Sequence, residues 1–249
     1  MSQLRVTPPR PSPVPYDPAE DGPLLAVFDL DGTLVDSAPD LAASLNHCLR
    51  GAGMDEIGLD DIRPNAGKGV RVMLEYAYDR AGVPLDEDLR AAHTERFLAH
   101  YQAHIADLSQ PFPGTVEMLE RLAACGVVMA VCTNKFEGLA RSLLDALGLS
   151  CHFATVCGAD TFARRKPDPI HLLGTIERAG SNAARAVMIG DTMTDIDAAF
   201  ACGIPSILAD FGYEPDETAR RAATRVISDF AAIDADMLER LLARRLAAG

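Results

Sequence analysis

The chain has 249 residues, of which 48% are hydrophobic and 24% charged, so it can bury a sizeable core in one large domain or two smaller ones. Its net charge of −13 argues against nucleic acid and anionic membranes as partners. The sequence has no apolar run near the roughly 18 residues of a membrane span, and its six cysteines include no C-x-x-C pair. We therefore expect a cytoplasmic protein with reduced thiols.

Residues 1–23 contain seven prolines and almost no apolar periodicity. Such a segment cannot bury enough apolar surface to offset the entropy lost on ordering. We expect a disordered, partly polyproline tail and assign it no function.

The next stretch joins a short apolar run to a pair of aspartates. Leu24–Phe28 is too short for a helix and predicts a buried strand. Alternate residues of an extended chain point to the same side, so Asp29 and Asp31 should converge where the strand ends. Gly32 allows a turn that brings backbone N–H groups close to a ligand. Adjacent carboxylates repel unless a cation lies between them, so the stretch predicts a metal-and-phosphate site.

The residues that follow show helical periodicity and no strand pattern as far as Pro111. We expect one helix over residues 40–51, a second that begins after a cationic loop and ends near residue 81, and a third over residues 85–108. A polar stretch lies at 55–64. Residues 36–110 should therefore form a small all-helical domain inserted after the first strand. Its glycine-flanked cationic loop, Gly67–Arg71, carries Lys68 and Arg71.

Three histidines, His93, His100 and His104, share one face of the expected helix 85–108. Metal ligation by these imidazoles is conceivable. No acidic or cysteine partner stands at a supporting spacing, so a solvated or packing face is the favoured interpretation.

From Thr115 onward, short apolar strands alternate with helices to the C-terminus. The strands are expected near residues 127–132, 154–157, 186–189, 206–208 and 225–227. This alternation is typical of a parallel, doubly wound α/β sheet covered on both faces. Residues 24–35 and 111–249 should build this core, with ligands bound beyond the carboxyl ends of the strands.

Three further polar motifs lie at strand ends or in loops of this predicted core. Thr133 and Asn134 follow the second strand, and Lys166 precedes a proline ahead of a helix. Asp191 and Asp195 follow the strand at 186–189. Each motif alone is weak evidence, because strand-end threonines and charged turns are common.

Together with Asp29-Leu30-Asp31-Gly32-Thr33, these motifs resemble the four signatures of the haloacid dehalogenase (HAD) superfamily, in order and over about residues 24–208. The resemblance implies a Rossmann-like core with a helical cap. It also implies phosphoryl transfer in which Asp29 is the nucleophile and Asp31 the general acid and base. Mg²⁺ would be held by Asp29, Asp31 and Asp191. Asp195 would not bind the ion directly but would orient a water molecule or Lys166. The implied phosphate-binding residues are Gly32, Thr133, Asn134 and Lys166. Lys68 and Arg71 are the cap candidates for the substrate's remote end.

Within the superfamily, the sequences Asp-Ser-Ala-Pro-Asp-Leu, Pro-Phe-Pro-Gly and Arg-Arg-Lys-Pro-Asp-Pro resemble those of phosphoglycolate phosphatases. This predicts a Mg²⁺-dependent phosphomonoester hydrolase acting on a small-molecule phosphate ester through an aspartyl-phosphate. The alternatives are a phosphomutase of the β-phosphoglucomutase kind, a sugar-phosphate or nucleotide phosphatase, and a non-catalytic phospho-ligand sensor. The sequence carries no prediction of oligomeric state.

Overall fold

The computed structural model describes residues 22–248, and the predicted tail 1–23 lies almost entirely outside them. Its core is a six-stranded parallel sheet with strand order β5-β4-β1-β6-β7-β8, as the alternating sequence pattern predicted. The strands are β1 Leu25–Phe28, β4 Val128–Cys132, β5 Thr155–Cys157, β6 Ala186–Gly190, β7 Ser206–Ala209 and β8 Arg225–Ile227.

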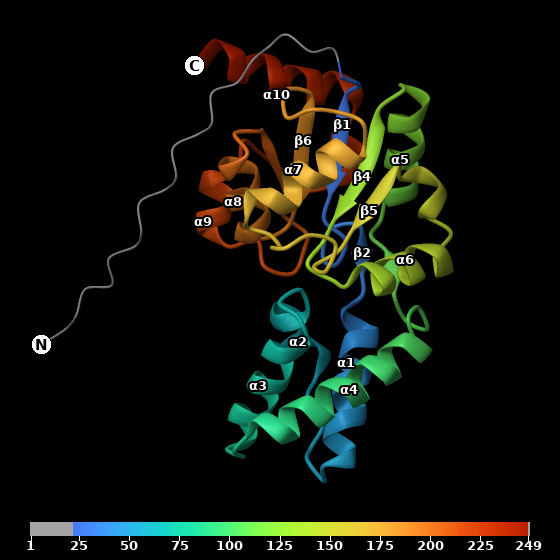
Figure 1. Ribbon diagram of the computed structural model, residues 1–249, viewed down its shortest axis with the longest axis vertical. Coiled ribbons are helices and arrows are strands. Elements are labelled where there is room, and N and C mark those ends of the chain that lie inside the picture. Colours follow the sequence, from blue (N-terminus) through green and yellow to red (C-terminus); the bar gives the residue numbers. More distant parts are fainter. Residues whose placement is uncertain (1–21, 249) are drawn as a thin grey trace, which may run out of the picture.

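Helices cover both faces of this sheet (Figure 1). The core helices are α5 Thr115–Ala124, α6 Glu137–Ala146, α7 Pro169–Arg178, α8 Met193–Ala201, α9 Glu217–Ala222 and α10 Ala235–Ala248, with short 3₁₀ turns at Ser150–His152 and Phe230–Ala232. Among the described residues, no helix has the length and apolar character needed to cross a bilayer.

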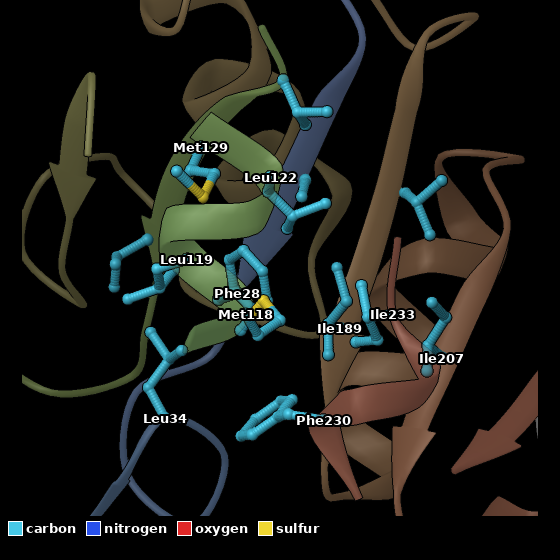
Figure 2. Close-up of a cluster of buried hydrophobic side chains, with 14 of the residues drawn as sticks. Phe28, Leu34, Met118, Leu119, Leu122, Met129, Ile189, Ile207, Phe230 and Ile233 are labelled. Carbon is cyan, nitrogen blue, oxygen red and sulfur yellow. The ribbon is translucent and has the colours of Figure 1, made fainter. Parts of the chain in front are cut away.

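The buried strand β1 divides its side chains between the two faces, because alternate residues of a strand point in opposite directions. Ala26 and Phe28 pack with α5, α6 and α10, and Figure 2 shows Leu119 and Leu122 of α5 beside this strand. Leu25 and Val27 pack on the opposite face with α7 and α8. The first strand is thus apolar on both sides, and its polar residues begin only where it ends.

An all-helical cap is inserted after β1, and Figure 1 shows it as a separate group of helices below the sheet. It consists of α1 Ala38–Gly51, α2 Leu59–Ala66, α3 Val70–Ala81 and α4 Glu87–Ala103, which share a hydrophobic cluster of their own. The chain passes between core and cap twice. These two segments form short antiparallel strands, β2 Val35–Asp36 and β3 Gln110–Pro111, that pair with each other.

Local structure departs from the sequence predictions in several places, which include the short strands β2 and β3. The polar stretch at 55–64 contains most of α2, whose Ile62 and Ala66 are buried one helical turn apart. Helix α9 was missed because it has only six residues. The helix predicted over 85–108 ends at Ala103, and at its predicted end the buried carboxylate of Asp40 accepts the backbone N–H groups of Leu108 and Ser109. Those N–H groups therefore bond a side chain instead of continuing the helix.

The three cap histidines do not converge. His93 is buried edge-on against Tyr78, whereas His100 stacks between His47 and His104, with ring centroids 4.3 and 4.5 Å away. Among residues 22–248, the group of acidic, imidazole or thiol side chains whose ligand atoms come together lies elsewhere, in the core.

Candidate active site

The first two predicted site residues lie directly beyond β1, at the carboxyl edge of the sheet. The Asp29 N–H donates to the carbonyl of Ile189 on the neighbouring strand β6, which continues the sheet by one residue. Both carboxylates are mostly buried, with 14% of the Asp29 side chain and 10% of the Asp31 side chain exposed. They face the same cavity, which has a volume of about 760 Å³.

Asp191 and Asp195 bring two more acids to this edge. Asp191 follows β6 and accepts hydrogen bonds from the Thr33 hydroxyl (2.9 Å) and the Tyr213 N–H (2.8 Å). Asp195 lies in the first turn of α8, where it accepts the Thr192 N–H and hydroxyl in a capping box. Carboxylate oxygens of Asp29, Asp191 and Asp195 all lie within 4.8 Å of one another.

Gly32 is required between these acids for two reasons. Its φ of +84° is one that residues with a side chain rarely adopt. A Cβ atom built there would lie 2.4 Å from Oδ2 of Asp191. The close approach of two motifs distant in sequence therefore depends on a residue without a side chain.

Burial makes this acidic cluster electrostatically costly. Loss of solvation raises the pKa of Asp29 from 3.8 to about 6, although Lys166 pulls it down. Burial, together with Asp195 and Asp29, raises the pKa of Asp191 well above 3.8. Convergent carboxylate oxygens are the donor set that a hard divalent cation such as Mg²⁺ prefers, so the residues present fit such an ion.

Lys166 supplies a buried positive charge to the described site. Its Nζ lies 2.6 Å from Oδ1 of Asp195 and 3.0 Å from Oδ1 of Asp29. Its backbone is fixed on both sides: the N–H donates to Nδ1 of His171, and the carbonyl accepts from the side chain of Asn134. The two acids raise the pKa of the ammonium and outweigh its burial, so it stays charged.

Thr133 and Asn134 also line the cavity. Thr133 follows β4, is almost fully buried, and its N–H donates to the Cys157 carbonyl of β5. Both residues line the cavity beside Asp29 and Lys166. The structure thus brings together predicted site residues from four separated segments of the core.

The two cap cations lie farther out. Lys68 lines the same cavity but pairs with Glu214 of the core, Nζ to Oε1 2.9 Å, and 41% of its side chain is exposed. Arg71 does not line this cavity; it borders an adjoining one of about 280 Å³ and pairs with Glu75 on its own helix.

Sequence reasoning missed several residues that contact the site, among them Thr33, Ser37, Lys135 and Tyr213. Lys135 places its Nζ 2.9 and 3.1 Å from the two carboxylate oxygens of Asp31. Its position directly after Thr133 and Asn134 was the available signal. Tyr213, in the loop after β7, binds Asp191 through its N–H and Asp36 through its hydroxyl. No pattern in the sequence singled out this tyrosine.

Comparison with known proteins agrees with this geometry. Phosphoglycolate phosphatases of Agrobacterium fabrum and Mesorhizobium japonicum are 45% and 44% identical to this chain, over 90% and 88% of it and 96% of each relative. The crystal structure of a predicted phosphoglycolate phosphatase from Haemophilus somnus superposes with a TM-score of 0.78 at 28% identity, covering 87% of this chain and 97% of that one. The family model for haloacid dehalogenase-like hydrolases matches residues 26–209. The chain therefore belongs to the haloacid dehalogenase-like hydrolase family.

Proposed function

We propose that the protein is a Mg²⁺-dependent phosphatase that hydrolyses 2-phosphoglycolate through an aspartyl-phosphate on Asp29. The observation that carries the proposal is the meeting of Asp29, Asp31 and Lys166 in one cavity. The substrate is taken from the curated relatives, which are named phosphoglycolate phosphatases at 45% and 44% identity over nearly their whole length.

In the proposed reaction, a carboxylate oxygen of Asp29 attacks phosphorus in line with the ester oxygen. A bond forms between that oxygen and phosphorus while the phosphorus–ester bond breaks, which divides one difficult step into two. Asp31 gives a proton to the leaving glycolate oxygen. It then takes a proton from the water that attacks phosphorus, and Asp29 is released. Both aspartates line the cavity, which supports these roles.

Charge neutralisation is the main catalytic requirement, because the phosphate oxygens repel the attacking carboxylate. Lys166, the Thr133 hydroxyl and the backbone N–H groups at Gly32 and Asn134 would hold the transferring oxygens. Asp195, which binds Nζ of Lys166, would keep this ammonium in place. Asp29, Asp191 and the Asp31 carbonyl would hold the Mg²⁺. When bound, the ion supplies positive charge to the phosphoryl oxygens.

The helical insertion at 36–110 would act as a cap over the core formed by 24–35 and 111–249. The cap places Lys68 at the cavity and Arg71 beside the adjoining one, each paired with a glutamate. Closure of such a cap excludes water and completes the site. We place the enzyme in the cytoplasm, since all six cysteines are free thiols.

The test is phosphate release from 2-phosphoglycolate with Mg²⁺, and again with excess chelator. We expect hydrolysis that disappears with the chelator and returns with added Mg²⁺. Full activity in excess chelator would contradict the mechanism. A parallel assay with β-glucose 1-phosphate and a hexose bisphosphate activator would reveal a mutase. The likeness to a Clostridium difficile β-phosphoglucomutase, at 17% identity and a TM-score of 0.72, shows the fold alone.

A further inference from the structure

The chain contains three lysines, Lys68, Lys135 and Lys166, and all three line the 760 Å³ cavity. Their surroundings differ. Lys166 lies between Asp29 and Asp195 at the phosphate end, and Lys68 is a partly exposed partner of Glu214. Lys135 is 6% exposed and has no role in the mechanism above. Burial of a charged group costs free energy, so a buried lysine is expected to bind an anionic partner, even in a protein of charge −13.

Lys135 stands at the junction of core and cap. Its Nζ binds both oxygens of Asp31 and lies 4.6 Å from the ring centroid of Tyr101, a residue of cap helix α4. An ammonium group has three N–H donors, so the Asp31 carboxylate leaves one of them for a second acceptor. Lys135 and Asp31 line both the main cavity and the adjoining one of about 280 Å³.

Tyr101 offers a second donor at the same place. It is 1% exposed and lines the adjoining cavity; its buried hydroxyl lies beside the Lys135 ammonium, and its own proton has no acceptor among residues 22–248. Burial raises the pKa of Tyr101 to about 12, so the hydroxyl keeps its proton. Buried hydroxyl protons rarely lack an acceptor, and this one, beside a buried ammonium at the edge of a cavity, is placed to donate to an anionic ligand.

The covalent structure of the substrate also places its carboxylate near Lys135 and Tyr101. In the mechanism above, the leaving oxygen of phosphoglycolate lies at Asp31. A single methylene joins that oxygen to the carboxylate, so the carboxylate must lie close to Asp31 and its neighbours. Lys135 is the ammonium that contacts Asp31, whereas Lys68 pairs with Glu214 at the cavity's exposed side.

We propose that Lys135 and Tyr101 form the subsite that binds the substrate's carboxylate, a specificity determinant that rests on the proposed phosphoglycolate phosphatase function. Lys135 gives a charge-assisted hydrogen bond from the core, and the Tyr101 hydroxyl gives a second one from the cap. A carboxylate held by both residues links cap to core. Phosphate esters without a carboxylate make neither contact.

The test compares kcat/KM for 2-phosphoglycolate with kcat/KM for ethyl phosphate, which has an alkoxide leaving group and no carboxylate. We expect Lys135→Met to lower the ratio of the two constants by about 10–100-fold. Tyr101→Phe, which removes one oxygen atom, should lower it by about 3–10-fold. The matched control is Tyr78→Phe, another buried cap tyrosine, whose hydroxyl faces His93. This control should leave the ratio unchanged.

The outcomes separate the inference from the proposed function. Equal losses on both substrates, or no loss on either, in Lys135→Met and Tyr101→Phe would overturn the subsite. So would a fall in the ratio caused by Lys68→Met and not by Lys135→Met. If Lys135→Met does not fold, Tyr101→Phe alone decides. A wild-type enzyme that does not hydrolyse phosphoglycolate would refute the proposed function instead.

Discussion

Nζ of Lys166 lies 3.0 Å from Oδ1 of Asp29, although the two residues come from motifs far apart in the sequence. The lysine is 1% exposed and the aspartate 14%, so water screens this pair only weakly. The same ammonium also holds Asp195. The charge of the proposed nucleophile is therefore balanced by one side chain, whose loss should affect the whole site.

Replacing Lys166 by methionine should lower kcat for phosphoglycolate by about 10²–10³-fold, the usual cost of removing one donor to developing negative charge. The measurement is steady-state phosphate release with saturating Mg²⁺. Lys68→Met provides a comparison within the same cavity, where the lysine is partly exposed and should contribute less to kcat. A kcat for Lys166→Met within a few-fold of wild type would exclude it from phosphate binding.

Asp29→Asn should abolish turnover while the protein remains folded, because an amide is a poor nucleophile. Burial already disfavours the charged carboxylate of Asp29, so the neutral amide should cost little stability in the metal-free protein. Circular dichroism and thermal melting check the fold, and phosphate release checks the activity. A variant with the wild-type rate would show that another residue is the nucleophile.

Stabilisation by Mg²⁺ should increase with pH. In the metal-free protein the pKa of Asp29 is raised to about 6, so its contribution to stability is present below the unfolded pKa and is lost as pH rises through about 6. Mg²⁺ binds the deprotonated carboxylates and must displace protons below this pH. The gain in Tm on adding Mg²⁺ should therefore be larger at about pH 7.5 than at about pH 5. A gain independent of pH would exclude Asp29 and Asp191 as metal ligands.

Asp40 should matter for stability. This buried carboxylate accepts the N–H groups of Leu108 and Ser109 and the Ser109 hydroxyl, which ties the start of α1 to the chain returning from the cap. Asp40→Ala leaves these donors unsatisfied and should lower the free energy of unfolding by about 2–4 kcal/mol. The control is Asp107→Ala, which removes an exposed acid from the same returning segment. Equal melting temperatures for the two variants would contradict the role of Asp40.

The sequence predicted the parallel sheet and the helical insertion because both rest on local patterns. Apolar runs such as Val128–Cys132 are bounded by helices, and the polar residues of each motif follow directly where a strand ends. The carboxyl ends of parallel strands lie along one edge of a sheet, so the meeting of Asp29 with Asp191 could be inferred without coordinates.

Contacts between core and cap could not be inferred in this way. Tyr101 reaches Lys135, and Glu214 reaches Lys68, only through the packing of the cap against the core. No periodicity specifies that orientation. The early end of α4 was not inferable either, because Asp40, which binds the chain beyond that helix, lies on another cap helix, α1.

The most direct test of the central claim is the specificity constant of the wild-type enzyme for 2-phosphoglycolate, measured with Mg²⁺ beside β-glucose 1-phosphate, glucose 6-phosphate and AMP. Phosphoglycolate should have the highest kcat/KM, by at least about tenfold, because a bound carboxylate contributes about 1.5–3 kcal/mol to its recognition. A sugar phosphate or nucleotide hydrolysed faster than phosphoglycolate would contradict the substrate assignment.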